Sequence, residues 1–105
     1  MASFSVHANA NPVTCGTIPF LLDVQSEVLS GLGTRLMVPL YRRDAVPGPP
    51  IASLTPVLTF QGVPLVAMFP EMAGVPRRCL GAQVGELAAA RPEVMAAMDL
   101  MLAGF

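Results

Sequence analysis

Residues 92–105 read Pro-Glu-Val-Met-Ala-Ala-Met-Asp-Leu-Met-Leu-Ala-Gly-Phe, and this stretch decides the architecture of the chain. A proline and an acid in the first turn, followed by strong helix formers, predict a helix. At about 100° per residue, one side of this helix is apolar and wide enough to lie on a sheet. That side consists of Val94, Met98, Met101 and Phe105, flanked by Ala97 and Leu102.

The opposite side of the helix is less polar than a side that meets only water. It carries Met95, Ala96, Leu100 and Ala103, with Glu93 and Asp99 as its only charges. We therefore expect something besides water to cover part of it. Phe105 either folds back onto the core of the protein or binds a partner.

Length and composition favour one small domain that spans residues 1–105 and forms a homodimer. The chain is 53% hydrophobic and only 12% charged, and small chains with excess apolar surface usually bury it by self-association. Prolines and glycines interrupt every apolar run before it reaches the roughly 18 residues of a membrane span. The N-terminus lacks the pattern of a signal peptide, so we expect a cytoplasmic protein with no membrane segment.

The two cysteines, Cys15 and Cys79, fit no metal-binding spacing, and buried free thiols are the expected state in the cytoplasm. The net charge of −1 and the absence of lysine exclude the basic stripe that direct nucleic-acid binding requires. The arginine doublets at 42–43 and 77–78 are read as solvated strand ends.

Alternating and β-branched residues predict six strands before the helix, the last of them short. The first contains Phe4 and Val6 and is expected at the outside of the sheet, with His7 on the surface. The second covers residues 20–25, with a solvated or backbone-bonded Asp23. The third covers residues 35–41, where Pro39 indicates an edge or a bulge.

The fourth and fifth strands, residues 54–60 and 63–68, form a hairpin across Gln61-Gly62, and both are expected to be central. A loop is predicted for residues 9–19, and a turn with a short strand for residues 70–76. Residues 83–90 have a helical composition.

The sequence contains few groups from which an enzyme could be built. It has one histidine, one tyrosine and no tryptophan, and no motif for a phosphate, a dinucleotide or zinc. Ser26 and Glu27 lack an orienting third residue. We therefore expect no catalytic residue, no metal and no cofactor, and a mostly β interaction protein.

Two blocks of sequence resemble the CcdB family of toxins. Residues 20–29, Phe-Leu-Leu-Asp-Val-Gln-Ser-Glu-Val-Leu, and residues 33–40 are similar to the family's "DVQS … RxMVIPL" signature. Residues 54–58, 72–76 and the tail are similar to its "LYPVV", "MASVP" and "INLMFWGI" segments, in the same order. The likeness spans residues 20–105.

The resemblance implies an SH3-like barrel-type antiparallel sheet with a C-terminal helix, assembled as a homodimer. It also implies a non-enzymatic toxin that binds the DNA gyrase A subunit, traps the cleavage complex and is neutralised by a CcdA-like antitoxin. The implied gyrase-binding residues are Val28, Leu29, Asp99, Leu102, Ala103, Gly104 and Phe105, and the implied dimer contacts are Met72, Met98, Met101 and Phe105. Ala103 stands where the family has a tryptophan.

Two alternatives stay open. The first is an endoribonuclease of the related MazF and Kid type, for which the arginines at 42, 43, 77 and 78 are the only candidate residues. The second is a non-toxic relative that still binds an antitoxin.

Overall fold

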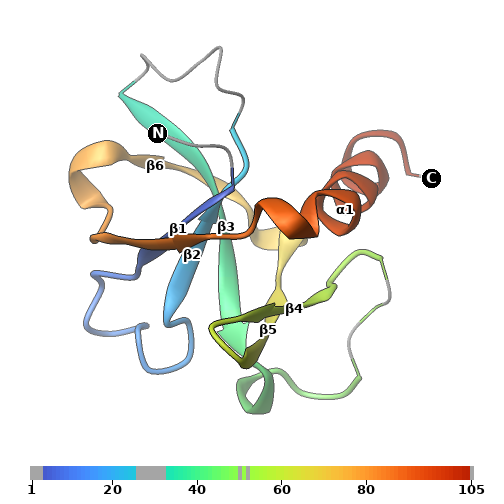
Figure 1. Ribbon diagram of the computed structural model, residues 1–105, viewed down its shortest axis with the longest axis horizontal. Helices are drawn as coiled ribbons and strands as arrows, with labels where there is room; N and C mark the ends of the chain where they lie inside the picture. The colour runs from blue at the N-terminus through green and yellow to red at the C-terminus, as the bar shows by residue number, and fades with distance from the viewer. Residues whose placement is uncertain (1–3, 26–32, 50, 52, 105) are drawn as a thin grey trace.

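The computed structural model describes residues 4–25, 33–49, 51 and 53–104, which fold into a curled antiparallel half-barrel followed by one helix (Figure 1). Among these residues the strands form one sheet in the order β4-β5-β3-β2-β1-β7, and β6 pairs with β3 off this path. The strands are β1 (Ser5–Ala8), β2 (Phe20–Asp23), β3 (Thr34–Arg42), β4 (Val57–Phe60), β5 (Val63–Ala67), β6 (Ala73–Pro76) and β7 (Gln83–Glu86), and the helix is α1 (Arg91–Ala103). The mainly β, SH3-like barrel-type fold with a C-terminal helix is thus confirmed.

The long strand β3 is the spine of this sheet. One of its edges pairs with β2, and the other pairs first with β6 and then with β5. Pro39 lies in register with Leu21 of β2, between the β6 and β5 pairings, and its carbonyl accepts from the Met68 amide at 3.0 Å. Its ring nitrogen therefore faces the junction between two partner strands. The prediction of an edge or a bulge was wrong. Between the two partner strands no backbone amide of β3 has to donate a hydrogen bond, so a proline fits there.

Strand β1 is an interior strand, contrary to the expectation of an outer one. It pairs with β2 on one side and with β7 on the other. The partner β7 occupies part of the segment for which helical composition was noted, so that interpretation was also wrong. A short 3-10 turn, η5 (Ala88–Ala90), connects β7 to the helix.

The hairpin of β4 and β5 follows the sequence prediction at its turn. Gln61 and Gly62 have φ values of 52° and 80°, as a two-residue type I′ turn requires. Strand β4 pairs with β5 on one side and is the end of the strand order. It is therefore an edge strand, and only β5 of this hairpin is central as predicted.

Side chains bring the two end strands of the half-barrel together. A Cβ atom built on Gly85 of β7 would lie 2.7 Å from the ring of Phe60 in β4. The Gln61 side chain donates to the Val84 carbonyl at 3.2 Å. Phe60 also packs edge-on against Phe20, with ring centroids 5.2 Å apart. Packing of an aromatic ring onto a glycine thus closes the half-barrel where no strand ladder does.

The core lies between this curled sheet and α1. Its buried members come from six strands or their flanks and from the helix, and they are Phe4, Val6, Leu22, Val38, Leu40, Leu58, Phe60, Leu65, Ala67, Phe69, Leu87, Ala90, Val94 and Ala97. Met98 and Met101 pack against this core, as the predicted apolar side requires. Leu102, expected at the flank of that side, is instead 77% exposed.

Two further expectations about the surface can be compared with the structure. Cys15 and Cys79 are free but exposed, so the expectation of buried thiols was wrong. The arginine doublets at 42–43 and 77–78 are exposed and lie at the C-terminal ends of β3 and β6, as expected. No helix in the described part of the chain is long and apolar enough to span a membrane.

Candidate functional site

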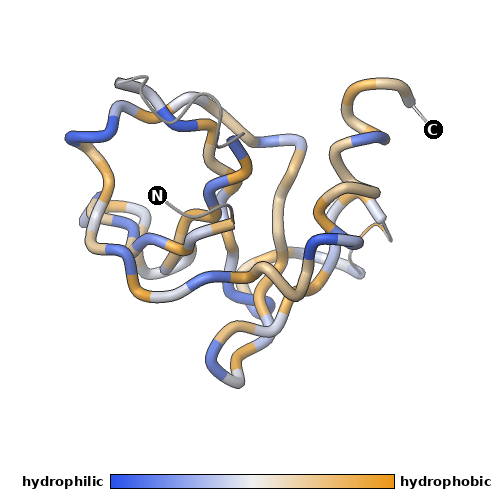
Figure 2. Tube along the Cα trace, turned by 45° about the horizontal axis from the view of Figure 1, so that its top comes forward, coloured by the Kyte–Doolittle hydropathy of each residue, from blue (hydrophilic) through white to orange (hydrophobic). Residues whose placement is uncertain are grey.

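The end of α1 exposes apolar residues on the surface of the molecule. Asp99, Leu102, Ala103 and Gly104 are all exposed there, and Leu102 keeps 77% of its surface accessible. In Figures 1 and 2 this end of the helix projects to the periphery of the molecule, and hydrophobic colouring covers much of it. Phe105 lies outside the described residues.

The first half of the helix fixes the direction of this projection. Val94 and Ala97 are fully buried, and α1 contacts the turns η5 and η3 (Phe69–Glu71). The Arg91 guanidinium lies 5.6 Å from the centroid of the Phe4 ring, which adds a cation–π contact at the first turn. Because the first half of α1 is packed against the core, the C-terminal end of the helix is held in a fixed position in solvent.

The final residue of this surface, Gly104, terminates the helix. Its φ of 77° is in the left-handed region, and its amide donates to the Leu100 carbonyl at 2.9 Å. A glycine in this conformation is a common helix stop. The chain therefore leaves the helix immediately after Ala103.

The second implied gyrase-binding segment holds Val28 and Leu29, and both lie outside the described residues. Its two flanks are described, and hydrogen bonds connect them. The Val24 amide donates to the Leu36 carbonyl at 3.0 Å, and the Leu36 amide donates to the Gln25 side-chain carbonyl at 2.8 Å. The residues before and after this segment are thereby held side by side.

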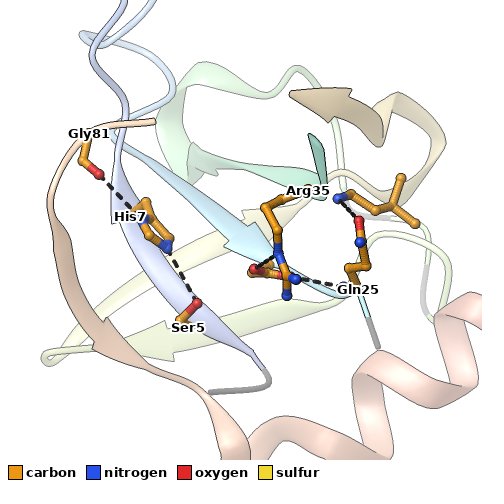
Figure 3. A network of polar contacts seen from close by, with 7 residues as sticks. Ser5, His7, Gln25, Arg35 and Gly81 are labelled. Carbon is orange, nitrogen blue, oxygen red and sulfur yellow. Dashed lines mark hydrogen bonds and ion pairs between the residues drawn. The ribbon is translucent and has the colours of Figure 1, made fainter. Parts of the chain in front are cut away.

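A buried ion pair supports these flanks. Arg35 donates through Nε to Asp23 Oδ2 at 2.7 Å and through Nη2 to Oδ1 at 3.0 Å, and both side chains are 0% exposed. The backbone amide of Gln25 donates to the same carboxylate at 2.9 Å. Figure 3 shows Arg35 and Gln25 close together. Arg35 Nη1 has no hydrogen-bond partner in the part of the chain that the structure describes.

This geometry decides between the two environments expected for Asp23, which were solvent and a bond to the backbone. The carboxylate is bonded to the backbone, as predicted in part, but it is not solvated. Its principal partner is an arginine that follows it by 12 positions. The Asp, Gln and Arg of the recognised signature are thus a structural network rather than a reactive site.

His7 is the only histidine of the chain, and it is buried at 4% exposure rather than on the surface. Its Nδ1 donates to the Gly81 carbonyl at 3.1 Å, so its Nε2 accepts from the Ser5 hydroxyl at 3.3 Å (Figure 3). Both ring nitrogens are therefore used within the fold. The surface assignment was wrong, because the chain returns to this ring at Gly81, just before β7.

Tyr41 and Glu71 form a polar contact on the surface. The phenol donates to the carboxylate at 2.5 Å. This hydrogen bond, together with burial and the negative charge of Glu71, raises the pKa of Tyr41 to about 12. The pair ties the end of β3 to η3, on which α1 rests.

The implied dimer contacts have a mixed environment. Met72, Met98 and Met101 are half-buried and pack against the core of their own chain. Each leaves part of its side chain accessible, and their role in a dimer stays a prediction. No group of three or more His, Cys, Asp or Glu side chains able to hold a metal ion occurs within the described residues.

Comparison with known proteins identifies one family. No curated protein matches this sequence significantly. The sequence model of the family described as CcdB protein matches residues 3–104, which include both the Asp23–Arg35 network and the whole of α1. The resemblance found in the sequence is thereby confirmed over nearly the full chain. The chain therefore belongs to the CcdB family, the toxins of toxin–antitoxin modules.

Proposed function

We propose that this protein acts in the cytoplasm as a homodimeric toxin that binds the A subunit of DNA gyrase and traps its cleavage complex. A CcdA-like antitoxin neutralises it. It has no catalytic residue of its own in this mechanism, because binding alone stalls the target. The observation that carries the proposal is the exposed apolar end of α1.

A partner that covers Leu102 would gain hydrophobic free energy. Burying a leucine side chain contributes roughly 1.5 to 3 kcal/mol, and the fold leaves 77% of this one in water. Asp99, Ala103 and Gly104 surround it and complete a small apolar surface with one charge. Phe105 and the pair Val28 and Leu29 extend the proposed gyrase contact.

Ala103 sets the strength of this contact. In the resembling toxins a tryptophan at this position stacks on an arginine of gyrase, an interaction of about 0.5 to 2 kcal/mol. Its loss corresponds to roughly two- to thirtyfold in affinity. We therefore expect weak gyrase binding by the natural chain and tighter binding by Ala103→Trp, because the position is exposed and has room for an indole.

The homodimer brings two such helix ends to the symmetric gyrase dimer. We expect the accessible parts of Met72, Met98 and Met101, with Phe105, to form the contact between the two copies. Sedimentation of the purified protein at micromolar concentration tests this: a single species of monomer mass would contradict the dimer.

The mechanism is tested by expressing the protein from a tight promoter in cells with normal gyrase or with gyrase resistant to CcdB. Growth arrest in the first strain alone is the expected result. Leu102→Asp abolishes the arrest if the helix end makes the contact, whereas Asp44→Asn, an exposed change in η2 (Arg43–Ala45), leaves it intact. Equal arrest in both strains would exclude gyrase as the target.

The endoribonuclease alternative has less support. Arg42 is paired with Asp44 at 2.8 Å, and His7 is held inside the fold. Cleavage of RNA by the purified protein that disappears on replacing Arg77 and Arg78 would support the alternative. Intact RNA would remove it.

A further inference from the structure

Phe4 has an unusual backbone conformation for a bulky residue. Its φ of 61° lies in the left-handed region, which large side chains rarely adopt because it costs free energy. The side chain is 6% exposed and belongs to the same core as Val94 and Ala97 of α1. Its carbonyl accepts from the Leu87 amide at 2.8 Å. Contacts with the rest of the fold therefore hold Phe4 in a conformation that it would not keep alone.

The first turn of α1 has few polar attachments. The chain is bonded to Phe4 as far as Leu87, and the alanines of η5 follow before the helix begins. No side chain caps the start of the helix, and Glu93 and Asp99 form no ion pair with any residue that the structure describes. The Arg91 guanidinium, whose Cζ lies 5.6 Å from the centroid of the Phe4 ring, is thus the charged group that joins this turn to the rest of the fold.

Small changes at this turn have large effects at the other end of the helix. At about 1.5 Å per residue, Gly104 lies roughly 20 Å from Arg91 along α1. A tilt of about 10° at the first turn would move the helix end by about 3 Å, whereas a binding surface has to be held to about 0.5 Å. The packing of Val94 and Ala97 is apolar and non-directional, but a cation over a ring has a preferred geometry.

We propose that Phe4 and Arg91 form a clamp that sets the direction of α1, and that both are positioning residues for its exposed end. The Leu87 hydrogen bond keeps Phe4 in place, and the guanidinium holds the first turn of the helix over the ring. Without the clamp, α1 tilts about η5 and opens more often while the sheet stays folded. The effect of the clamp on gyrase binding rests on the proposed function, whereas the clamp itself does not.

Amide hydrogen exchange of the full chain, followed for each residue by NMR, tests the clamp. We expect Arg91→Gln to accelerate exchange in α1 about two- to fivefold, as the loss of one exposed cation–π contact predicts, with β2 and β3 unchanged. In a Phe4→Leu background, which keeps an apolar side chain but has no ring, Arg91→Gln has no further effect. An equal effect in both backgrounds, or equally accelerated exchange in β2 and β3, would overturn the proposal.

Two variants serve as controls for the loss of charge. Arg91→Lys keeps a cation over the ring and restores slow exchange in α1. Arg43→Gln removes the same charge from η2 and leaves exchange in α1 unchanged. Residual dipolar couplings of the α1 amides report the direction of the helix, and we expect them to change in Arg91→Gln and to return in Arg91→Lys. Unchanged couplings in Arg91→Gln would overturn the positioning role.

The consequence for gyrase has its own measurement. Calorimetric titration of a gyrase A fragment is carried out in the Ala103→Trp background, in which we expect tighter binding. Addition of Arg91→Gln weakens binding roughly two- to fivefold, although Arg91 lies outside the proposed contact. Unchanged affinity in a variant whose helix direction has changed would overturn the positioning role. Failure of the proposed function is shown separately, by gyrase binding that Leu102→Asp does not affect.

Discussion

Replacing Asp23 by Asn removes the charge that balances Arg35 inside the protein. The two side chains are 0% exposed and share two hydrogen bonds. Removing one partner of such a pair leaves a buried charge without compensation, which costs about 3 to 5 kcal/mol. Small domains are stable by only about 5 to 15 kcal/mol, so the variant retains a marginal fold.

Urea denaturation measures this loss. With an m-value of about 1.5 kcal/mol per M, the midpoint of unfolding falls by roughly 2 to 3 M. The double variant Asp23→Leu with Arg35→Met removes both charges and recovers most of the stability, because well-packed apolar residues often replace buried ion pairs without loss.

The chain offers a matched control in a second aspartate–arginine pair. Asp44 and Arg42 also lie 2.8 Å apart, but their side chains are 70% and 54% exposed. Asp44→Asn therefore costs less than about 1 kcal/mol. Equal losses for Asp23→Asn and Asp44→Asn would refute the reasoning, because burial would then have no part in the energy of the pair.

Two other changes test separate parts of the fold. Gly85→Ala places a methyl group 2.7 Å from the Phe60 ring and destabilises the protein by about 1 to 3 kcal/mol in urea; Gly16→Ala meets nothing within 4 Å, and a similar loss there would contradict the packing argument. The Tyr41–Glu71 bond contributes to stability at pH values below about 10 and is lost as the pH rises towards the raised pKa of Tyr41, about 12. Because Tyr41 is the only tyrosine, its absorbance titration reports this pKa directly; Glu71→Gln shifts the midpoint towards the ordinary value of about 10, and an unchanged midpoint would exclude Glu71 as the cause.

The sequence predicted those elements whose conformation depends on residues that are close together in the chain. The proline and the helix formers after Arg91 define α1, and the Gln61-Gly62 turn has the positive φ values that a tight hairpin requires. These features depend on neighbouring residues alone. They could therefore be predicted without knowledge of the fold.

The remaining features depend on contacts between distant segments. Residues 83–86 have weak strand propensity and become β7 because the edge of β1 pairs with them. The residues just before β7 bring the Gly81 carbonyl to the buried His7 ring. Likewise, Asp23 is buried because Arg35 returns to it across the β2–β3 ladder. No local pattern indicates such partners. The sequence analysis therefore placed His7 on the surface and expected Asp23 to be solvated or bonded to the backbone.

The candidate site likewise has one part that could be predicted from the sequence and one part that could not. Family resemblance indicated Leu102, Ala103 and Gly104, and the structure places all three at the exposed end of α1. The shallow hollows beside Ala96 were not predicted, because Ser53 and Pro56, which are distant from α1 in the sequence, also line them. In the sequence, only the apolar residues on the outer side of the helix indicated that this side is not simply solvated.

Calorimetric titration of a gyrase A fragment with the natural chain, Leu102→Asp and Ala103→Trp tests the central claim most directly. We expect weak but measurable binding by the natural chain, none by Leu102→Asp, and roughly two- to thirtyfold tighter binding by Ala103→Trp. Binding that is unaffected by Leu102→Asp, or absent even in Ala103→Trp, would contradict the claim that the end of α1 contacts gyrase.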